Sequence, residues 1–222
     1  MHAVIHIPNF ELQARLRDEP DLRDKPAALL DEIPSLKRQQ DKHRIVQLTA
    51  AARQAHVEPG MTATQGLARC FSLPVFNRDS AREDTAQEAL LQYAGGLSPR
   101  IESTAPGVCT IDLKGASHRQ LDGRILAQRC LAGLSRLNLD ARIGIAANPD
   151  LALLAARFGQ PIRILGSDRK AARKFLDPLP VQALDPEADT LKILQGWGIK
   201  TLGQLTALPQ DEVIQRLGRE LL

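Results

Sequence analysis

Once residues 21–76 are set aside, strand-like and helical segments follow one another in an order that leaves few folds open. The patterns predict strand, helix, strand, strand, helix, strand at residues 3–7, 80–94, 100–104, 108–113, 119–137 and 142–146. This order is typical of a ferredoxin-like sheet. We therefore expect an α+β protein in which residues 21–76 form a second lobe inserted into the sheet.

Two further parts of the chain have their own patterns. The inserted segment combines short strands and short helices, predicted at residues 27–30, 44–48, 49–55 and 62–70. From residue 159 onward the chain is predicted to be helical, with a short turn at 196–201. Glycine and threonine in such a turn are typical of a helix-hairpin-helix, whose backbone N–H groups can hold a DNA phosphate. Taken alone the motif is a weak indication, because most such turns are only turns.

Composition excludes several classes of protein. With 43% hydrophobic and 25% charged residues the chain is globular rather than disordered. No apolar run reaches the roughly 18 residues that a membrane span needs. Cys70, Cys109 and Cys130 lie far apart with no C-x-x-C, which excludes a disulfide framework and a zinc ribbon and suits a reducing cytoplasm. The net charge of +3 is too small to indicate nucleic-acid binding by itself.

Basic residues nevertheless gather in two short runs. The first lies within residues 35–53 and the second within residues 163–174, and each contains a single aspartate. Their members are Lys37, Arg38, Lys42, Arg44 and Arg53 in the first run and Arg163, Arg169, Lys170, Arg173 and Lys174 in the second. Each run is either a solvated surface or a set of phosphate contacts, and the sequence leaves both interpretations open.

Three stretches resemble the Y-family translesion DNA polymerases. They are HRIVQLTAAARQAHVEPGM at 43–61, SPRIESTAPGVCTIDL at 98–113 and GIAANPDLALLAARFGQP at 144–161. The resemblance implies a right hand with a ferredoxin-like palm at 1–20 and 78–158, inserted fingers at 21–77 and a helix-hairpin-helix thumb at 159–222. The little finger and C-terminal tail of such proteins do not fit within these residues, so the chain resembles an N-terminal fragment.

The same resemblance points to a missing metal site. The family binds two Mg²⁺ ions through carboxylates in D-x-D-x-F-F and in D-E, because magnesium requires hard oxygen ligands. The corresponding positions here are His6, Pro8, Gly107 and Val108. Proline and valine have no ligand atom in the side chain, and an imidazole suits a softer metal. We therefore expect neither a bound metal nor a cofactor. A displaced site on Glu102 and Asp112 is the alternative.

Other positions of the nucleotide site are altered as well. Glu11 replaces the aromatic residue that shields the sugar, Ala50 replaces a phosphate-binding tyrosine, and Pro149 and Gln160 replace two lysines. Phe10, Arg53 and Asn148 persist. After L-P-V-x-A-L at 179–184, where active members have a glycine-rich hairpin, the acidic segment 185–189 follows, which implies a weakened phosphate contact in the thumb.

This pattern of losses resembles the catalytically deficient ImuB branch of the family, as do the opening H-x-P-x-F-x-L, A-A-R at 51–53 and L-P-V-x-A-L. The resemblance implies a scaffold for damage-induced mutagenesis (the SOS response) that binds DNA without sequence preference in the bacterial cytoplasm, at the nucleoid during the damage response. Its implied partners are a RecA-like accessory protein of the ImuA type, an error-prone C-family DNA polymerase and the sliding clamp, reached mostly through regions beyond Leu222.

Predicted DNA contacts come from the fingers, the start of the thumb and the hairpin turn. They are Arg44, Arg53, Arg169, Lys170, Arg173, Lys174, Gly198, Lys200 and Thr201. Two other hypotheses remain. One is an active nucleotidyltransferase whose metal site is relocated or completed by a partner. The other is a stand-alone helix-hairpin-helix module, which leaves the predicted sheet unexplained.

Overall fold

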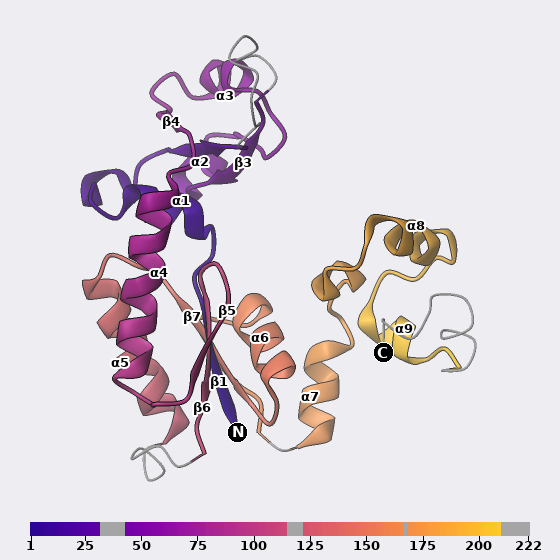
Figure 1. The fold of residues 1–222 in the computed structure, drawn as a ribbon. Helices are drawn as coiled ribbons and strands as arrows, with labels where there is room; N and C mark the ends of the chain where they lie inside the picture. Colours follow the sequence, from indigo (N-terminus) through magenta and orange to yellow (C-terminus); the bar gives the residue numbers. More distant parts are fainter. Residues whose placement is uncertain (32–42, 115–121, 167, 210–222) are drawn as a thin grey trace.

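A computed structural model describes residues 1–31, 43–114, 122–166 and 168–209 of the chain. Its main sheet has the order β5-β6-β1-β7-β8 (Figure 1). These strands are β1 (His2–His6), β5 (Ile101–Ala105), β6 (Val108–Asp112), β7 (Arg142–Ala146) and β8 (Ile162–Ile164). Within this sheet β1, β5, β6 and β7 pair antiparallel in the order of a ferredoxin-like sheet. The predicted fold class is confirmed.

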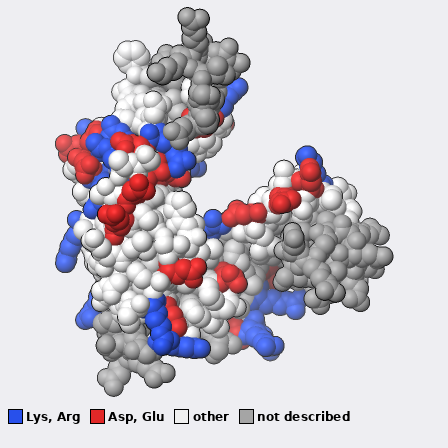
Figure 2. Space-filling model, in the orientation of Figure 1, with Lys and Arg blue, Asp and Glu red and all other residues white. Residues whose placement is uncertain are grey.

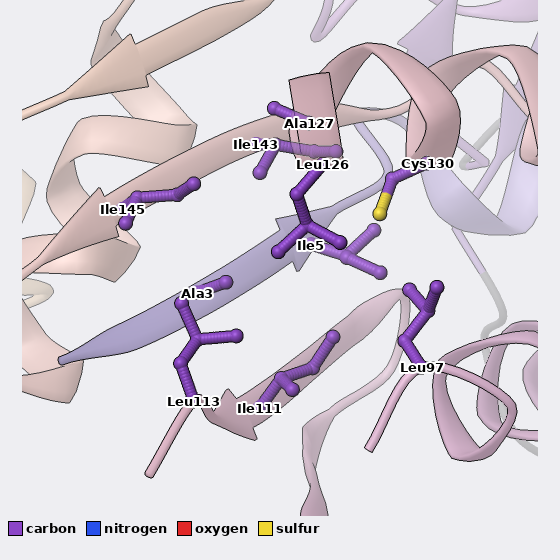
Figure 3. A pocket seen from close by; sticks show the side chains of 10 residues that line it. All are labelled: Ala3, Ile5, Leu97, Ile111, Leu113, Leu126, Ala127, Cys130, Ile143 and Ile145. Carbon is purple, nitrogen blue, oxygen red and sulfur yellow. The ribbon is translucent and has the colours of Figure 1, made fainter. Parts of the chain in front are cut away.

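One face of this sheet forms the largest core. Alternate residues of β1, β6 and β7 point to the helices α4 (Ser80–Gly95) and α5 (Gly123–Arg136), which cover the face together (Figure 1). A cavity of about 10 Å³ lies in this layer, lined by aliphatic side chains and Cys130 (Figure 3). It is at the lower limit for one water and offers few polar partners, so it belongs to the packing. Burial raises the pKa of the Cys109 and Cys130 thiols to about 11, which keeps both unreactive.

The opposite face of the sheet is covered by α6 (Pro149–Phe158) (Figure 1). The helix begins where the Asn148 side chain accepts a hydrogen bond from the backbone N–H of Leu151, and proline occupies its first turn. Gly144 allows the close approach, because a Cβ there would lie 2.0 Å from the carbonyl oxygen of Ala152. The alanines of α6 therefore pack directly on the sheet.

The inserted segment forms a second lobe at one end of the palm (Figure 1). Its three strands have the order β3-β2-β4. Its elements are η1 (Pro20–Leu22), β2 (Ala28–Leu30), β3 (Ile45–Leu48), α2 (Ala50–Gln54), α3 (Ala63–Arg69) and β4 (Val75–Phe76). This lobe has its own small core around Ile45 and Leu48. The fingers bounds 21–77 stay a prediction, and Lys37, Arg38 and Lys42 lie outside the described residues.

The helix α1 (Phe10–Leu16) connects the palm to this lobe. Asn9 precedes it, but its backbone is left-handed and its side chain does not cap the helix. The Asn9 amide instead donates to the carbonyl oxygen of Leu48 at 3.1 Å. The backbone N–H of Leu12 donates to Gln47 Oε1 at 2.9 Å. Both contacts fix β3 against α1, so the Asn9 side chain holds the lobe in place rather than capping the helix.

The last part of the chain forms a helical thumb beside the palm (Figure 1). It contains α7 (Arg169–Leu176), η3 (Val181–Leu184), α8 (Ala188–Gly196) and α9 (Leu202–Thr206). Gly198 has a φ of +75° in the turn between α8 and α9, and Thr201 begins α9 with a capping box. Phe175 of α7 joins the cluster that includes Val4 of β1 and the alanines of α6.

The prediction that the chain is helical from residue 159 is wrong for its first residues. β8 pairs parallel with β7 and extends the palm sheet, with Ile143 opposite Ile162. A three-residue strand is too short for its period to be recognised. The start predicted at residue 119 for α5 lies outside the described residues. Within the described ranges, no helix combines the length and apolarity needed to cross a bilayer.

Candidate functional site

The four positions that the resemblance aligns with metal-binding acids come together at one corner of the palm. His6 is the last residue of β1 and pairs with Val108 of β6 and Arg142 of β7. The backbone N–H of Ile7 donates to the carbonyl oxygen of Gly107 at 2.8 Å, and Pro8 follows. Among the described residues, no three His, Cys, Asp or Glu side chains are grouped so that they could hold a metal ion. One imidazole as the available donor does not fit a magnesium pair.

The turn at Gly107 has a conformation that other residues rarely adopt. Its φ is +68°, and a Cβ there would lie 2.6 Å from Cβ of Phe10. The backbone N–H of Gly107 donates to Gln87 Oε1 at 2.8 Å, which fixes the turn against α4. The corner is therefore closed by Phe10 at the position where the resemblance places a metal-binding aspartate.

Positive charge surrounds His6 in this corner. Burial lowers the pKa of His6 to about 4, and the charges of Arg157 and Arg142 act in the same direction. Arg142 Nη1 also donates to the backbone carbonyl oxygen of Arg157 at 3.0 Å. The imidazole is therefore neutral at pH 7, and Arg142 and Arg157 bring positive charge close to it.

We expect the His6 imidazole to titrate near pH 4 when it is followed by NMR. Its folded pKa lies below the unfolded value of 6.5. It therefore stabilises the fold fully above about pH 6.5, and this contribution is lost as the pH falls through 6.5 toward 4. Replacement Arg157→Ala should raise the pKa of His6, whereas the His56 signals in the fingers lobe serve as the control. A His6 midpoint near 6.5 in the unaltered chain would contradict the described corner.

The remaining nucleotide-site positions do not all meet. Ala50 and Pro8 line the same groove, and Gln160 is exposed just after α6. Asn148 lies at the opposite end of α6, about 18 Å away along the helix axis, where it caps the helix. The Glu11 carboxylate accepts a hydrogen bond from Gln47 Nε2. Its negative charge is thus used to join α1 to the fingers lobe.

The groove between α1 and the start of β7 has a volume of about 360 Å³. Its wall contains an ion pair between Arg23 and Asp140, with 2.8 Å between nitrogen and oxygen. Gln13 Nε2 donates to the carbonyl oxygen of Asp140 at 3.0 Å. The lining residues are Pro8, Asn9, Leu12, Gln13, Leu16, Arg23, Asp24, Leu48, Thr49, Ala50, Asp140, Ala141, Arg142 and Pro161. Only strand register and tertiary packing bring Arg23 and Arg142 to this groove and Arg157 close to His6, so local sequence patterns do not predict these residues.

The two fingers arginines differ in their contacts. Arg44 Nη1 donates to the carbonyl oxygen of Gly60 at 3.0 Å, and its backbone N–H donates to Asp31 Oδ1 at 2.6 Å. Arg53 is exposed in the last turn of α2. Arg44 therefore stabilises the turn before α3, while Arg53 presents its charge at the surface.

The helix α7 carries the densest basic surface of the predicted contacts. Asp168 caps the helix by accepting from the backbone N–H of Lys170 at 2.9 Å, and Phe175 is buried on the side that faces the palm cluster. Arg169, Lys170, Arg173 and Lys174 are exposed, and basic side chains cover the place of α7 in Figure 2. They repeat at a spacing of four, so like charges are neighbours on the helix, which is unfavourable, and Arg173 is paired with Asp177 at 3.7 Å.

The hairpin turn is folded as predicted, yet its donors are already used. Gln204 Oε1 accepts from the backbone N–H of Lys200 at 2.8 Å and of Thr201 at 3.2 Å. The backbone N–H of Gly198 donates to the carbonyl oxygen of Gln195 at 2.9 Å. A phosphate at this turn would have to replace these bonds. DNA contacts of Gly198, Lys200 and Thr201 stay a prediction.

The alternative acids lie away from the corner. Asp112 pairs with His2 at the opposite end of β1 from His6, about 13 Å along the strand. Glu102 pairs with Thr110 on the neighbouring strands. The Asp112 carboxylate accepts from the backbone N–H of Lys114 at 2.8 Å and pairs with Arg100 at 3.3 Å. The Lys114 bond is the main cause that lowers the pKa of Asp112. Within the described residues, the Asp112 carboxylate thus contacts the Arg100 side chain and the Lys114 backbone.

A ferredoxin-like palm with an inserted lobe and a helix-hairpin-helix thumb defines a Y-family polymerase fold. DinB from Sulfolobus solfataricus has a TM-score of 0.75 and 15% identity over 99% of this chain and 64% of that protein. A post-insertion binary complex of Dbh DNA polymerase gives 0.74 and 15%, over 98% and 63%. At this identity the likeness shows the fold alone.

Residues 5–157 match the impB/mucB/samB family, and the chain belongs to this family. Protein ImuB of Caulobacter vibrioides is 28% identical over 160 residues, which are 72% of this chain and 34% of the relative. DNA polymerase IV of Acetivibrio thermocellus is 24% identical over 214 residues, 95% of this chain and 52% of the relative. DNA polymerase IV of Yersinia pseudotuberculosis is 25% identical over 99% of this chain and 62% of the relative. The chain thus spans about a third to three fifths of these curated relatives. The predicted ImuB-like, Y-family resemblance is confirmed.

Proposed function

We propose that this chain is a non-catalytic, polymerase-like scaffold that binds DNA without sequence preference during damage-induced translesion synthesis. The observation that carries the proposal is the composition of the palm corner, where His6, Pro8, Gly107 and Val108 stand together with no carboxylate among them. Phosphoryl transfer in such a fold needs metal ions to activate the primer hydroxyl and to neutralise the leaving pyrophosphate. The residues present supply neither function.

What the fold retains is the surface on which DNA could lie. The basic helix α7 and the hairpin turn belong to the same thumb, and Phe175 anchors that thumb to the palm. Cations fixed on rigid elements can neutralise phosphates whatever the base sequence. The replaced acids at the corner leave this surface intact, so loss of chemistry and retention of DNA binding are compatible.

The proposed partners follow from the relationship to ImuB rather than from a described surface. They are a RecA-like accessory protein of the ImuA type, an error-prone C-family DNA polymerase and the sliding clamp, which we place mostly on regions beyond Leu222. The proposal locates the protein in the bacterial cytoplasm, at the nucleoid during the damage response. In this role the chain would present DNA to an active enzyme.

Replacing six basic residues by alanine tests the DNA-binding part of the proposal. The residues are Arg44, Arg53, Arg169, Lys170, Arg173 and Lys174. We expect affinity for duplex DNA to fall at least about tenfold, and the slope of log K against log salt to fall by up to about 0.9 for each phosphate that is no longer neutralised. Fluorescence anisotropy over a salt series measures both quantities, and two unrelated DNA sequences should give the same values.

A matched variant removes the same number of exposed charges elsewhere. It replaces Arg69, Lys114, Arg124, Arg129, Arg136 and Lys192, all of which are exposed. This control should keep the original salt slope apart from a small general effect of net charge. An equal weakening of both variants would mean that the predicted contacts are ordinary solvated surface.

A further inference from the structure

Arg157 joins the palm to the thumb through an ion pair. It lies in the last turn of α6, and its Nη1 is 2.5 Å from Oδ2 of Asp185, in the loop between η3 and α8. The Arg157 side chain is 30% exposed, whereas the Asp185 side chain is 69% exposed. The cation is therefore held against the palm, and the carboxylate reaches it from the outer side.

The palm side of this pair is strongly positive. Arg142 donates to the carbonyl oxygen of Arg157, so a second guanidinium covers the carbonyl end of α6. Arg142 also lines the groove that contains Pro8 and Ala50. His6 lies close enough for both charges to lower its pKa and is itself neutral at pH 7. Two guanidinium groups thus meet at the corner without a carboxylate from the palm strands.

The thumb side of the pair is an acidic segment. Asp185, Glu187 and Asp189 follow one another at the start of α8, and acidic side chains lie along that edge of the thumb in Figure 2. Asp185 has a left-handed backbone, with φ of 48° and ψ of 47°, a conformation that aspartate adopts more readily than most residues. Asp185 is thus the residue of the acidic segment whose carboxylate contacts Arg157.

We propose that Arg157, with Arg142 beside it, binds a phosphate group of the DNA backbone, and that the Asp185 carboxylate occupies Arg157 until DNA displaces it. A guanidinium recognises carboxylate and phosphate through the same pair of N–H donors, so one can exchange for the other. The exchange removes one link between palm and thumb. This inference rests on the DNA-binding part of the proposed function.

Replacement Asp185→Asn tests the exchange, because the amide keeps the size of the side chain and removes its charge. We expect the variant to bind duplex DNA about two- to fivefold more tightly than the original chain, the range for an exposed ion pair. The matched control is Asp189→Asn. Asp189 lies in the same acidic segment but pairs with Lys192 on α8 at 2.8 Å instead of with Arg157. Each replacement removes one negative charge, so the change in net charge is identical.

A double-variant cycle shows whether Arg157 is the group that Asp185 blocks. Replacement Arg157→Ala should weaken DNA binding, and adding Asp185→Asn to it should give no further gain. Equal effects of Asp185→Asn and Asp189→Asn on DNA affinity would overturn the inference. So would a gain in DNA affinity from Asp185→Asn that stays complete in the Arg157→Ala background. If the original chain binds DNA with the expected salt slope in these cases, the proposed function stands while the inference fails.

A second arm distinguishes the source of the phosphate. The same variants are titrated with a nucleoside triphosphate, without and with magnesium. A gain for DNA with no comparable gain for the nucleotide supports a backbone phosphate as the ligand. A gain for the nucleotide alone would overturn the assignment to DNA.

Discussion

Restoring aspartate at Gly107 is expected to destabilise the chain by at least about 2 kcal/mol. A left-handed backbone costs a residue with a side chain about 1–2 kcal/mol, with aspartate at the lower end, and overpacking a closed site costs about 1–3 kcal/mol. Both apply here, because Gly107 has a φ of +68° and its added Cβ would lie 2.6 Å from Phe10. Urea denaturation at pH 7, followed by circular dichroism, measures the difference in unfolding free energy.

The control for this variant is Gly60→Asp. Gly60 also has a positive φ, +90°, but nothing lies within 4 Å of the Cβ that it would gain. It therefore carries the backbone cost and the added charge without the contact. We expect Gly107→Asp to lose clearly more stability than Gly60→Asp. Similar losses would show that Phe10 does not close the corner.

Primer extension is expected to be undetectable for the protein that carries this chain, with magnesium or with manganese. Each electrostatic contact that is made only in the transition state contributes on the order of a hundredfold to the rate. The corner lacks such contacts at His6, Pro8, Gly107 and Val108, where active members of the resembled family use metal ions. The assay compares the protein with an active DNA polymerase IV on the same primed template.

The outcome that would contradict this expectation is template-directed extension above the no-enzyme level. The variants Glu102→Gln and Asp112→Asn would then decide between the remaining explanations. Loss of the activity in both would support a displaced metal site on β5 and β6. Activity that survives both replacements would point to a site completed by another part of the protein or by a partner.

Local signals in the sequence predict much of the palm. The bounds predicted for the strand at 142–146 agree with β7, and the helix α6 that follows begins and ends at residues with clear local signals. The strand is a compact run of buried residues, and the helix has asparagine and proline at its start and glycine at its end. Such signals act within a few residues, so they are readable without knowledge of the fold.

The features that decide the site depend on pairing between distant segments. The sequence could show that acids are missing, but not that Arg142 lies opposite His6, because register is set by the whole sheet. Asparagine is a common helix N-cap residue, yet the side-chain amide of Asn9 donates to the carbonyl oxygen of Leu48 instead. The contact between Arg157 and Asp185 joins segments 28 residues apart. These residues have no local pattern that predicts their roles.

The shared cluster around Phe175 has a mechanical consequence. Because this ring from α7 packs with Val4 and with the alanines of α6, a force applied to the thumb is carried into the central strand of the palm. The thumb is thus packed directly against the sheet rather than joined to it by the chain alone. Its angle would be set by apolar packing that needs no metal and no nucleotide. Any DNA held between the two parts would therefore lie between elements whose relative orientation depends on this packing.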